Sequence, residues 1–114
     1  MIVFHQNLTK ERWQKMSFEE QMANVGSEIG RAINWKKNDP QRSRACFDRG
    51  LELLDLTRED PKNHTRIKLK ELCRLREILA DYFYFENSYK STDAQWNNYF
   101  MNFNYLIANK KYGI

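Results

Sequence analysis

Two side chains in this sequence have the types and spacing for acid–base chemistry on a phosphate, namely Arg58 and His64. A histidine can transfer a proton near neutral pH, and an arginine can stabilise the negative charge that develops during phosphoryl transfer. The neighbouring residues oppose this chemistry, because Glu59 and Asp60 repel phosphate and Pro61 interrupts the interval. The plainer interpretation is an arginine near a helix C-terminus and a solvent-exposed histidine in a loop.

The spacing of Arg58 and His64 resembles the R-x4-6-H motif of HEPN domains, which are small all-helical bundles. The resemblance implies a ribonuclease or toxin-system component, in which the arginine and histidine of two protomers meet at a dimer interface. It covers these two residues alone. Ribonuclease activity is therefore an alternative hypothesis here and not the first one.

No other group of residues points to catalysis. His5 has no partner at metal-ligand spacing, and Cys46 and Cys73 form no CxxC or Cys/His motif, so we expect no metal site. No nucleophile motif or Gly-rich phosphate loop is present, so we expect no cofactor and no conventional enzyme. Two isolated thiols and the absence of a secretory-signal pattern favour a cytoplasmic protein. No apolar run reaches the roughly 18 residues that would predict a membrane span.

Five basic residues form two short stripes that could lie along a phosphate backbone. They are Arg66, Lys70 and Arg74 on one predicted helix, and Arg42 and Arg49 on another. Glu77 and Asp81 continue the longer stripe, and mixed charge of this kind is typical of a solvent-exposed helix face. The net charge of +4 is a modest excess, so nucleic-acid binding is a second alternative.

Apolar residues at helical spacing predict the elements that position these side chains. The stripes fall at residues 18–33, 47–54, 69–83 and 96–107. Ser17 and Thr92 each begin a capping box, while Asp39 and Asp60 each precede a proline suited to the first helical position. The sequence therefore predicts an all-α fold, a four-helix bundle with an N-terminal arm.

We expect the arm to span residues 1–16 and to pack on the bundle through its apolar residues Val3, Phe4, Leu8 and Trp13. The bundle then spans residues 17–109, and residues 110–114 form a C-terminal tail. The core is expected to contain Phe18, Met22, Val25, Ile29, Phe47, Leu51, Leu54, Leu72, Leu75, Leu79, Phe83, Trp96, Phe100 and Phe103.

Three residues beside the core stripes carry further expectations. Gly26 and Gly30 lie within one predicted helix, where each costs about 1 kcal/mol relative to alanine, so we expect a neighbour close to that backbone. Arg76 flanks an apolar stripe, so its stem should be buried and its guanidinium paired, with Glu28 as the candidate partner.

Apolar residues also occur outside the core stripes. Ala94, Met101 and Tyr105 form a second stripe on the fourth helix, and Leu56 belongs to a similar patch on the second. No helix of a four-helix domain is fully enclosed, so a second apolar side indicates contact with another chain. Alternatively, the N-terminal arm covers one of these patches.

Four segments together resemble a group of small prokaryotic all-helical proteins that has no established activity. They are MANVGSEIGRAINWKK (22–37), RGLELLDLT (49–57), LKELCRLREILADYF (69–83) and STDAQWNNYF (91–100). The resemblance covers nearly the whole chain from residue 17 and implies an all-helical bundle from a bacterium, archaeon or phage. It carries no site residues.

The first hypothesis is thus a non-enzymatic bundle that self-associates and acts as a protein-binding or accessory subunit. Its expected partners are further copies of the chain, with another protein as a further possibility. The interface would contain Leu56, Ala94, Met101 and Tyr105.

Overall fold

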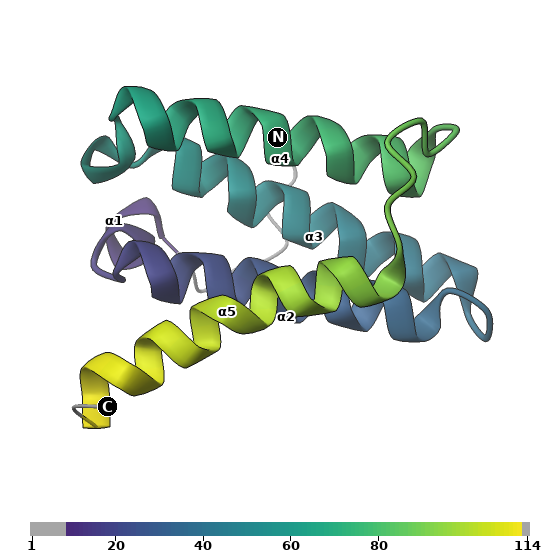
Figure 1. The fold of residues 1–114 in the computed structure, drawn as a ribbon, viewed down its shortest axis with the longest axis horizontal. Coiled ribbons are helices and arrows are strands. Elements are labelled where there is room, and N and C mark those ends of the chain that lie inside the picture. Colours follow the sequence, from purple (N-terminus) through teal and green to yellow (C-terminus); the bar gives the residue numbers. More distant parts are fainter. Residues whose placement is uncertain (1–8, 113–114) are drawn as a thin grey trace.

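The computed structural model describes residues 9–112 and contains four long helices and one short one (Figure 1). The elements are α1 (Lys10–Gln14), α2 (Phe18–Trp35), α3 (Pro40–Glu59), the 3-10 turn η1 (Pro61–Asn63), α4 (Arg66–Tyr84) and α5 (Asp93–Tyr112). No strand occurs between residues 9 and 112. The prediction of an all-α bundle with four long helices is confirmed.

The N-terminal capping interactions predicted from the sequence form at three of the four long helices. Ser17 and Glu20 make a capping box, in which the Glu20 amide donates to the Ser17 hydroxyl and the Ser17 amide to the Glu20 carboxylate, each at 3.1 Å. Asp39 caps α3 ahead of Pro40. The Thr92 amide likewise donates to the Gln95 side chain at 3.0 Å, and the Gln95 amide to the Thr92 hydroxyl at 3.1 Å.

Two boundaries differ from the sequence prediction. Asp60 and Pro61 begin the single turn η1, and α4 starts only at Arg66, with Thr65 as its N-cap. At the other end, α5 continues to Tyr112, into the segment expected as a tail. Lysines in the last turn interact favourably with the helix dipole, and Lys110 also donates to Glu19 at 2.8 Å.

The helix α2 packs closely against both α3 and α5 (Figure 1). Two glycines permit these approaches. A Cβ atom on Gly26 would lie 2.5 Å from the Cβ of Phe100 on α5, and one on Gly50 of α3 would lie 2.9 Å from Cδ1 of Ile29. The expectation of a close neighbour is confirmed for Gly26 and wrong for Gly30, where a Cβ would meet no atom within 4 Å.

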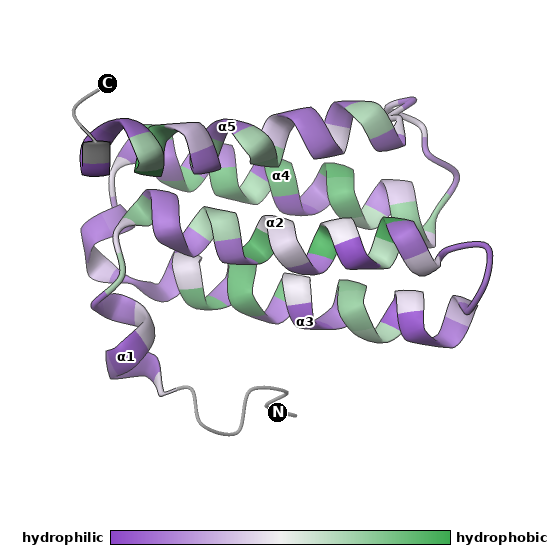
Figure 2. Ribbon diagram, turned by 90° about the horizontal axis from the view of Figure 1, so that it is seen from below, coloured by the Kyte–Doolittle hydropathy of each residue, from purple (hydrophilic) through white to green (hydrophobic). Residues whose placement is uncertain are grey.

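Aromatic side chains bridge α4 and α5 on the remaining side of the bundle. The rings of Tyr82 and Trp96 lie 6.3 Å apart, and the Tyr99 hydroxyl donates to Glu71 at 3.1 Å. Burial and then the Glu71 carboxylate raise the pKa of Tyr99, so its hydroxyl keeps the proton that it donates. The four long helices therefore run side by side, as Figure 2 shows, with α1 at one end.

The expected core is largely confirmed. Phe18, Leu51 and Phe83 are only partly buried and pack against it, whereas the other expected residues are buried. Trp13 of the arm is 2 % exposed and belongs to the same core. The other arm residues expected to pack there, Val3, Phe4 and Leu8, lie outside the described residues.

A buried polar cluster joins α1, α2 and the α3–α4 turn. Nε2 of Gln21 donates to the Trp13 carbonyl at 2.9 Å and to the Asp60 carboxylate at 2.8 Å. Nδ2 of Asn63 donates to Oε1 of Gln21 at 3.0 Å, and the Trp13 indole donates to the Thr57 hydroxyl at 3.2 Å. Because a buried polar group is costly without a partner, these bonds hold the three segments in one arrangement.

Asp60 is the charged member of this buried cluster and is 3 % exposed. Its carboxylate accepts hydrogen bonds from Gln21 and from the ammonium and backbone amide of Lys62. Burial raises the pKa of Asp60, but the hydrogen bonds from Lys62 and Gln21 outweigh it and leave the pKa below its ordinary value. The ionised form is therefore the one that the fold stabilises.

The buried Glu28 does not pair with Arg76, so that expectation is wrong. Arg49 of α3 donates to Glu28 at 2.7 Å, and Arg31 also pairs with it. Arg76 instead donates from Nε to Asp55 at 2.8 Å. Arg76 lies on α4, which packs against α3, the helix that carries Asp55. Glu28 lies on α2, which packs closely against α3 and thus against Arg49.

The two α2 glycines predict opposite effects of the same substitution. Gly26→Ala should lower the free energy of unfolding by about 1–3 kcal/mol, because its methyl group meets Phe100. Gly30→Ala should raise it by up to about 1 kcal/mol, because helix propensity improves where space is open. Urea denaturation of both variants measures this difference, and equal effects would contradict the packing described here.

Replacing Asp60 predicts a pH-dependent loss of stability. At pH 7, Asp60→Asn should lower the free energy of unfolding by about 1.5–3 kcal/mol, because it removes charge-assisted hydrogen bonds. A carboxylate with a lowered pKa stabilises the fold above its unfolded pKa of about 3.9, and this stability is lost as the pH falls through the folded pKa. Urea denaturation from pH 7 to pH 3 should therefore show the two proteins converging. A constant difference across this range would contradict the role of the charge.

Candidate functional site

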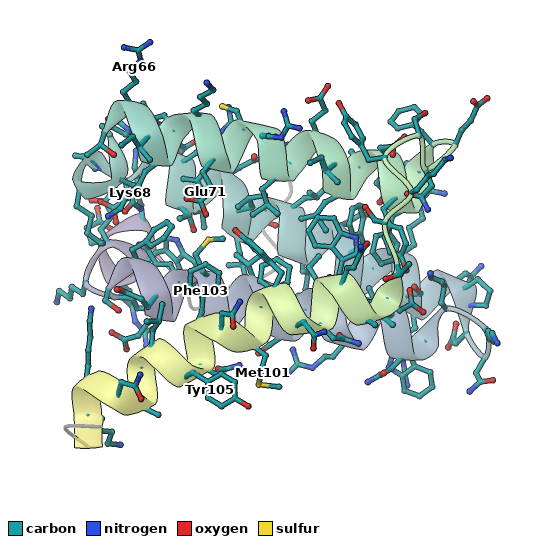
Figure 3. All side chains as sticks on the ribbon, viewed as in Figure 1. Arg66, Lys68, Glu71, Met101, Phe103 and Tyr105 are labelled. Carbon is teal, nitrogen blue, oxygen red and sulfur yellow. The ribbon has the colours of Figure 1, made fainter. Side chains whose placement is uncertain are left out.

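The outward face of α5 carries large apolar side chains that the bundle does not cover. Met101 is 47 % exposed and Tyr105 is 64 % exposed, and Ala94 is exposed on the same side of the helix. Figure 3 shows both larger side chains pointing away from the bundle, while Phe103 points from α5 towards α4. The structure therefore exposes the three α5 residues that the sequence analysis assigned to an interface.

This face also lacks charge. The chain is 30 % charged, yet from Ala94 to Asn109 α5 contains no Asp, Glu, Lys or Arg. An exposed helix face normally carries charged residues, and their depletion is a property of protein interface cores. The absence of charge was visible in the sequence, but it became informative only once the structure showed which side of α5 faces outward.

A hollow of about 360 Å³ lies beside this face, between α2 and α5. It is lined by Gly26, Ser27, Gly30, Arg31, Asn34, Asn97, Phe100, Met101 and Asn104. Gly30 leaves its α2 wall open, since a Cβ there would meet nothing within 4 Å. Sequence reasoning missed this hollow, because it joins residues far apart in the chain.

Leu56 is placed differently from the α5 residues. It is half-buried and packs against the core from α3, and its neighbour Leu53 is 3 % exposed. The helix α2 lies between α3 and α5 (Figure 1). Leu56 therefore does not belong to one continuous surface with Met101 and Tyr105.

Arg58 and His64 are in contact, but the contact joins the His64 side chain to the Arg58 backbone and not to the Arg58 guanidinium. Nε2 of His64 is hydrogen-bonded to the Arg58 carbonyl oxygen at 2.9 Å, a contact that satisfies an acceptor near the end of α3. The Arg58 guanidinium pairs with Asp55 at 3.3 Å. These contacts occupy both side chains within the protomer, and they do not support a proposal of RNA cleavage by these residues.

The structure separates the basic residues into two groups. Arg49 pairs with Glu28, which raises the pKa of Arg49, and the Arg42 guanidinium stacks on the Trp35 ring at 4.5 Å. Arg66, Lys70 and Arg74 are exposed on α4, and no carboxylate within residues 9–112 pairs with them. Figure 3 shows Arg66 pointing away from the bundle on the side opposite Tyr105.

The described part of the chain holds no group of three or more His, Cys, Asp or Glu residues that could bind a metal ion. Cys46 is buried and Cys73 exposed, and neither forms a disulfide. Among the helices described, none has the length and hydropathy needed to cross a membrane.

Comparison of the chain with protein-family models, with curated proteins and with solved structures finds no match.

Proposed function

We propose that the protein is a non-enzymatic helical bundle that self-associates through the outward face of α5 and acts as a cytoplasmic binding or accessory subunit. The observation that carries the proposal is the exposed, uncharged face formed by Ala94, Met101 and Tyr105. Methionine and aromatic residues are enriched at interfaces, and charged residues are depleted in interface cores. The unpaired cysteines suit a reducing compartment.

A second copy of the chain fits this face better than a charged partner does. In a twofold dimer each surface patch meets itself, so a patch of one charge sign would repel its own copy. The face offers asparagine amides instead, and an amide both donates and accepts hydrogen bonds. Asn97 and Asn104 line its edge and can pair with identical groups across a symmetry axis.

Adding charge to this face should abolish self-association. Sedimentation velocity or light scattering should show wild-type dimers or higher oligomers, and a Met101→Asp, Tyr105→Asp double variant should be monomeric, because two buried carboxylates per copy would lack partners. The matched control is Ile67→Asp, Phe85→Asp, which adds the same charge at side chains that are 80 % and 73 % exposed on α4 and its C-cap. This control should keep the wild-type mass. A monomeric wild-type protein would refute the proposal.

The exposed α4 stripe of Arg66, Lys70 and Arg74 supports nucleic-acid binding as a second candidate function. Cations without carboxylate partners can neutralise phosphates at no cost in broken ion pairs. Their spacing of four residues places them on one face of α4. Ile67 is 80 % exposed in the same helix and adds apolar area for contact with a base or sugar.

Salt dependence tests this second candidate. Binding of a fluorescent single-stranded RNA 20-mer, followed by anisotropy, should weaken with salt with a log–log slope of roughly −2 for three phosphate contacts. Lys70→Gln with Arg74→Gln should flatten the slope by roughly 1.4. The charge-matched control, Lys15→Gln with Lys37→Gln, changes exposed lysines away from α4 and should keep the wild-type slope. A salt-independent signal, or an equal loss in the control, would exclude the stripe.

A further inference from the structure

The hollow between α2 and α5 has a glycine, Gly30, in its α2 wall. A Cβ on Gly26 would collide with Phe100, but one on Gly30 would lie in empty space. Glycine at position 30 costs helix stability, and no contact within the bundle accounts for it. At about 360 Å³ the hollow lies in the size range of pockets that hold a small organic group.

The lining of the hollow carries one charged side chain and two side-chain amides that lack hydrogen-bond partners within residues 9–112. Arg31 is the charged residue, and its guanidinium shares the buried Glu28 carboxylate with Arg49. The side-chain amides of Asn34 and Asn97 make no hydrogen bond with any residue that the structure describes. The hollow thus offers apolar surface at Gly30 and Phe100 and side-chain amides at Asn34 and Asn97.

We infer that this hollow receives the Tyr105 side chain of a second copy of the chain, an inference that rests on the self-association proposed above. A phenol ring matches the apolar surface of Gly30 and Phe100, and its hydroxyl can donate to one amide and accept from another. Tyr105 is 64 % exposed, the largest exposed fraction among the large apolar side chains that the structure describes on α5. The tyrosine side chain has two rotatable dihedral angles, so fixing it in one conformation costs little conformational entropy.

The placement of Tyr105 and of the hollow suits a twofold dimer. Tyr105 projects from one flank of the Met101 position on α5, and the hollow lies on the other flank, towards α2. A twofold axis near Met101 therefore brings each Tyr105 over the hollow of the other copy. The same twofold axis relates the two tyrosine–hollow contacts, as an isologous interface requires.

Charge argues against a basic side chain as the occupant of the hollow. A cation there would face Arg31, whose partner Glu28 is shared with Arg49, so positive charge is in excess beside the hollow. A neutral aromatic group with one hydroxyl leaves no buried charge unpaired. Among the exposed side chains that the structure describes on α5, Tyr105 has this chemistry.

The inference is tested by filling the hollow and by removing its occupant. Gly30→Trp places an indole where a Cβ has free space, so the protomer should fold with a wild-type circular-dichroism spectrum. Sedimentation equilibrium should then show the dimer dissociation constant raised at least tenfold, and Tyr105→Ala should raise it similarly. The matched control is Tyr89→Ala, which removes a 47 % exposed tyrosine in the loop before α5 and should leave the constant unchanged.

The possible results separate this inference from the broader proposal. If the wild type dimerises and both Gly30→Trp and Tyr105→Ala dimerise equally well, the tyrosine-in-hollow contact is wrong while self-association stands. If Gly30→Trp does not fold, Tyr105→Ala decides alone against Tyr89→Ala. A wild-type protein that stays monomeric overturns both the contact and the proposed function.

Discussion

One buried amide holds together the end of the bundle at which three segments meet. Gln21 is fully buried and bridges the Trp13 carbonyl, the Asp60 carboxylate and the Asn63 side chain. An unpaired buried polar group costs about 1–3 kcal/mol, so the loss of any one partner leaves an unfavourable group behind. The arm before α2 and the turn after α3 are thereby fixed at the same end of α2. This constraint fixes where α3 ends and α4 begins relative to α2. It thereby decides which sides of α2 are left uncovered for α5 to pack against.

The position of α5 then depends on how closely α2 lets it approach. Gly26 admits Phe100 into contact with the α2 backbone, and the rings of Phe100 and Trp96 lie 6.2 Å apart along the inner side of α5. The opposite side of α5 is left with Met101 and Tyr105 in solvent. The same glycine-bearing face of α2 continues to Gly30, where no side chain of the bundle enters. The close contact and the hollow are therefore two consequences of one helix face.

The candidate residues differ in whether their side chains are exposed and able to reach a partner outside the bundle. Arg49 and Arg74 have the same charge and similar helical contexts in the sequence, yet Arg49 neutralises the buried Glu28 and Arg74 faces solvent. Likewise Leu56 and Met101 are both apolar residues off the main stripes, but Leu56 packs against the core and Met101 does not. Residue type gave the chemistry of each group, and the packing of neighbouring helices decided whether that chemistry could reach a partner.

The sequence by itself determined the elements, because capping and apolar periodicity are local properties that act within a few residues. Ser17 with Glu20, Asp39 with Pro40, and Thr92 with Gln95 form at the positions read from the sequence. Only the tertiary structure decided the partners of Gln21, Glu28 and Arg76, since these contacts join residues on different helices. It also decided the difference between Gly26 and Gly30, two residues with the same local context, because the space beside a glycine depends on where a distant helix lies.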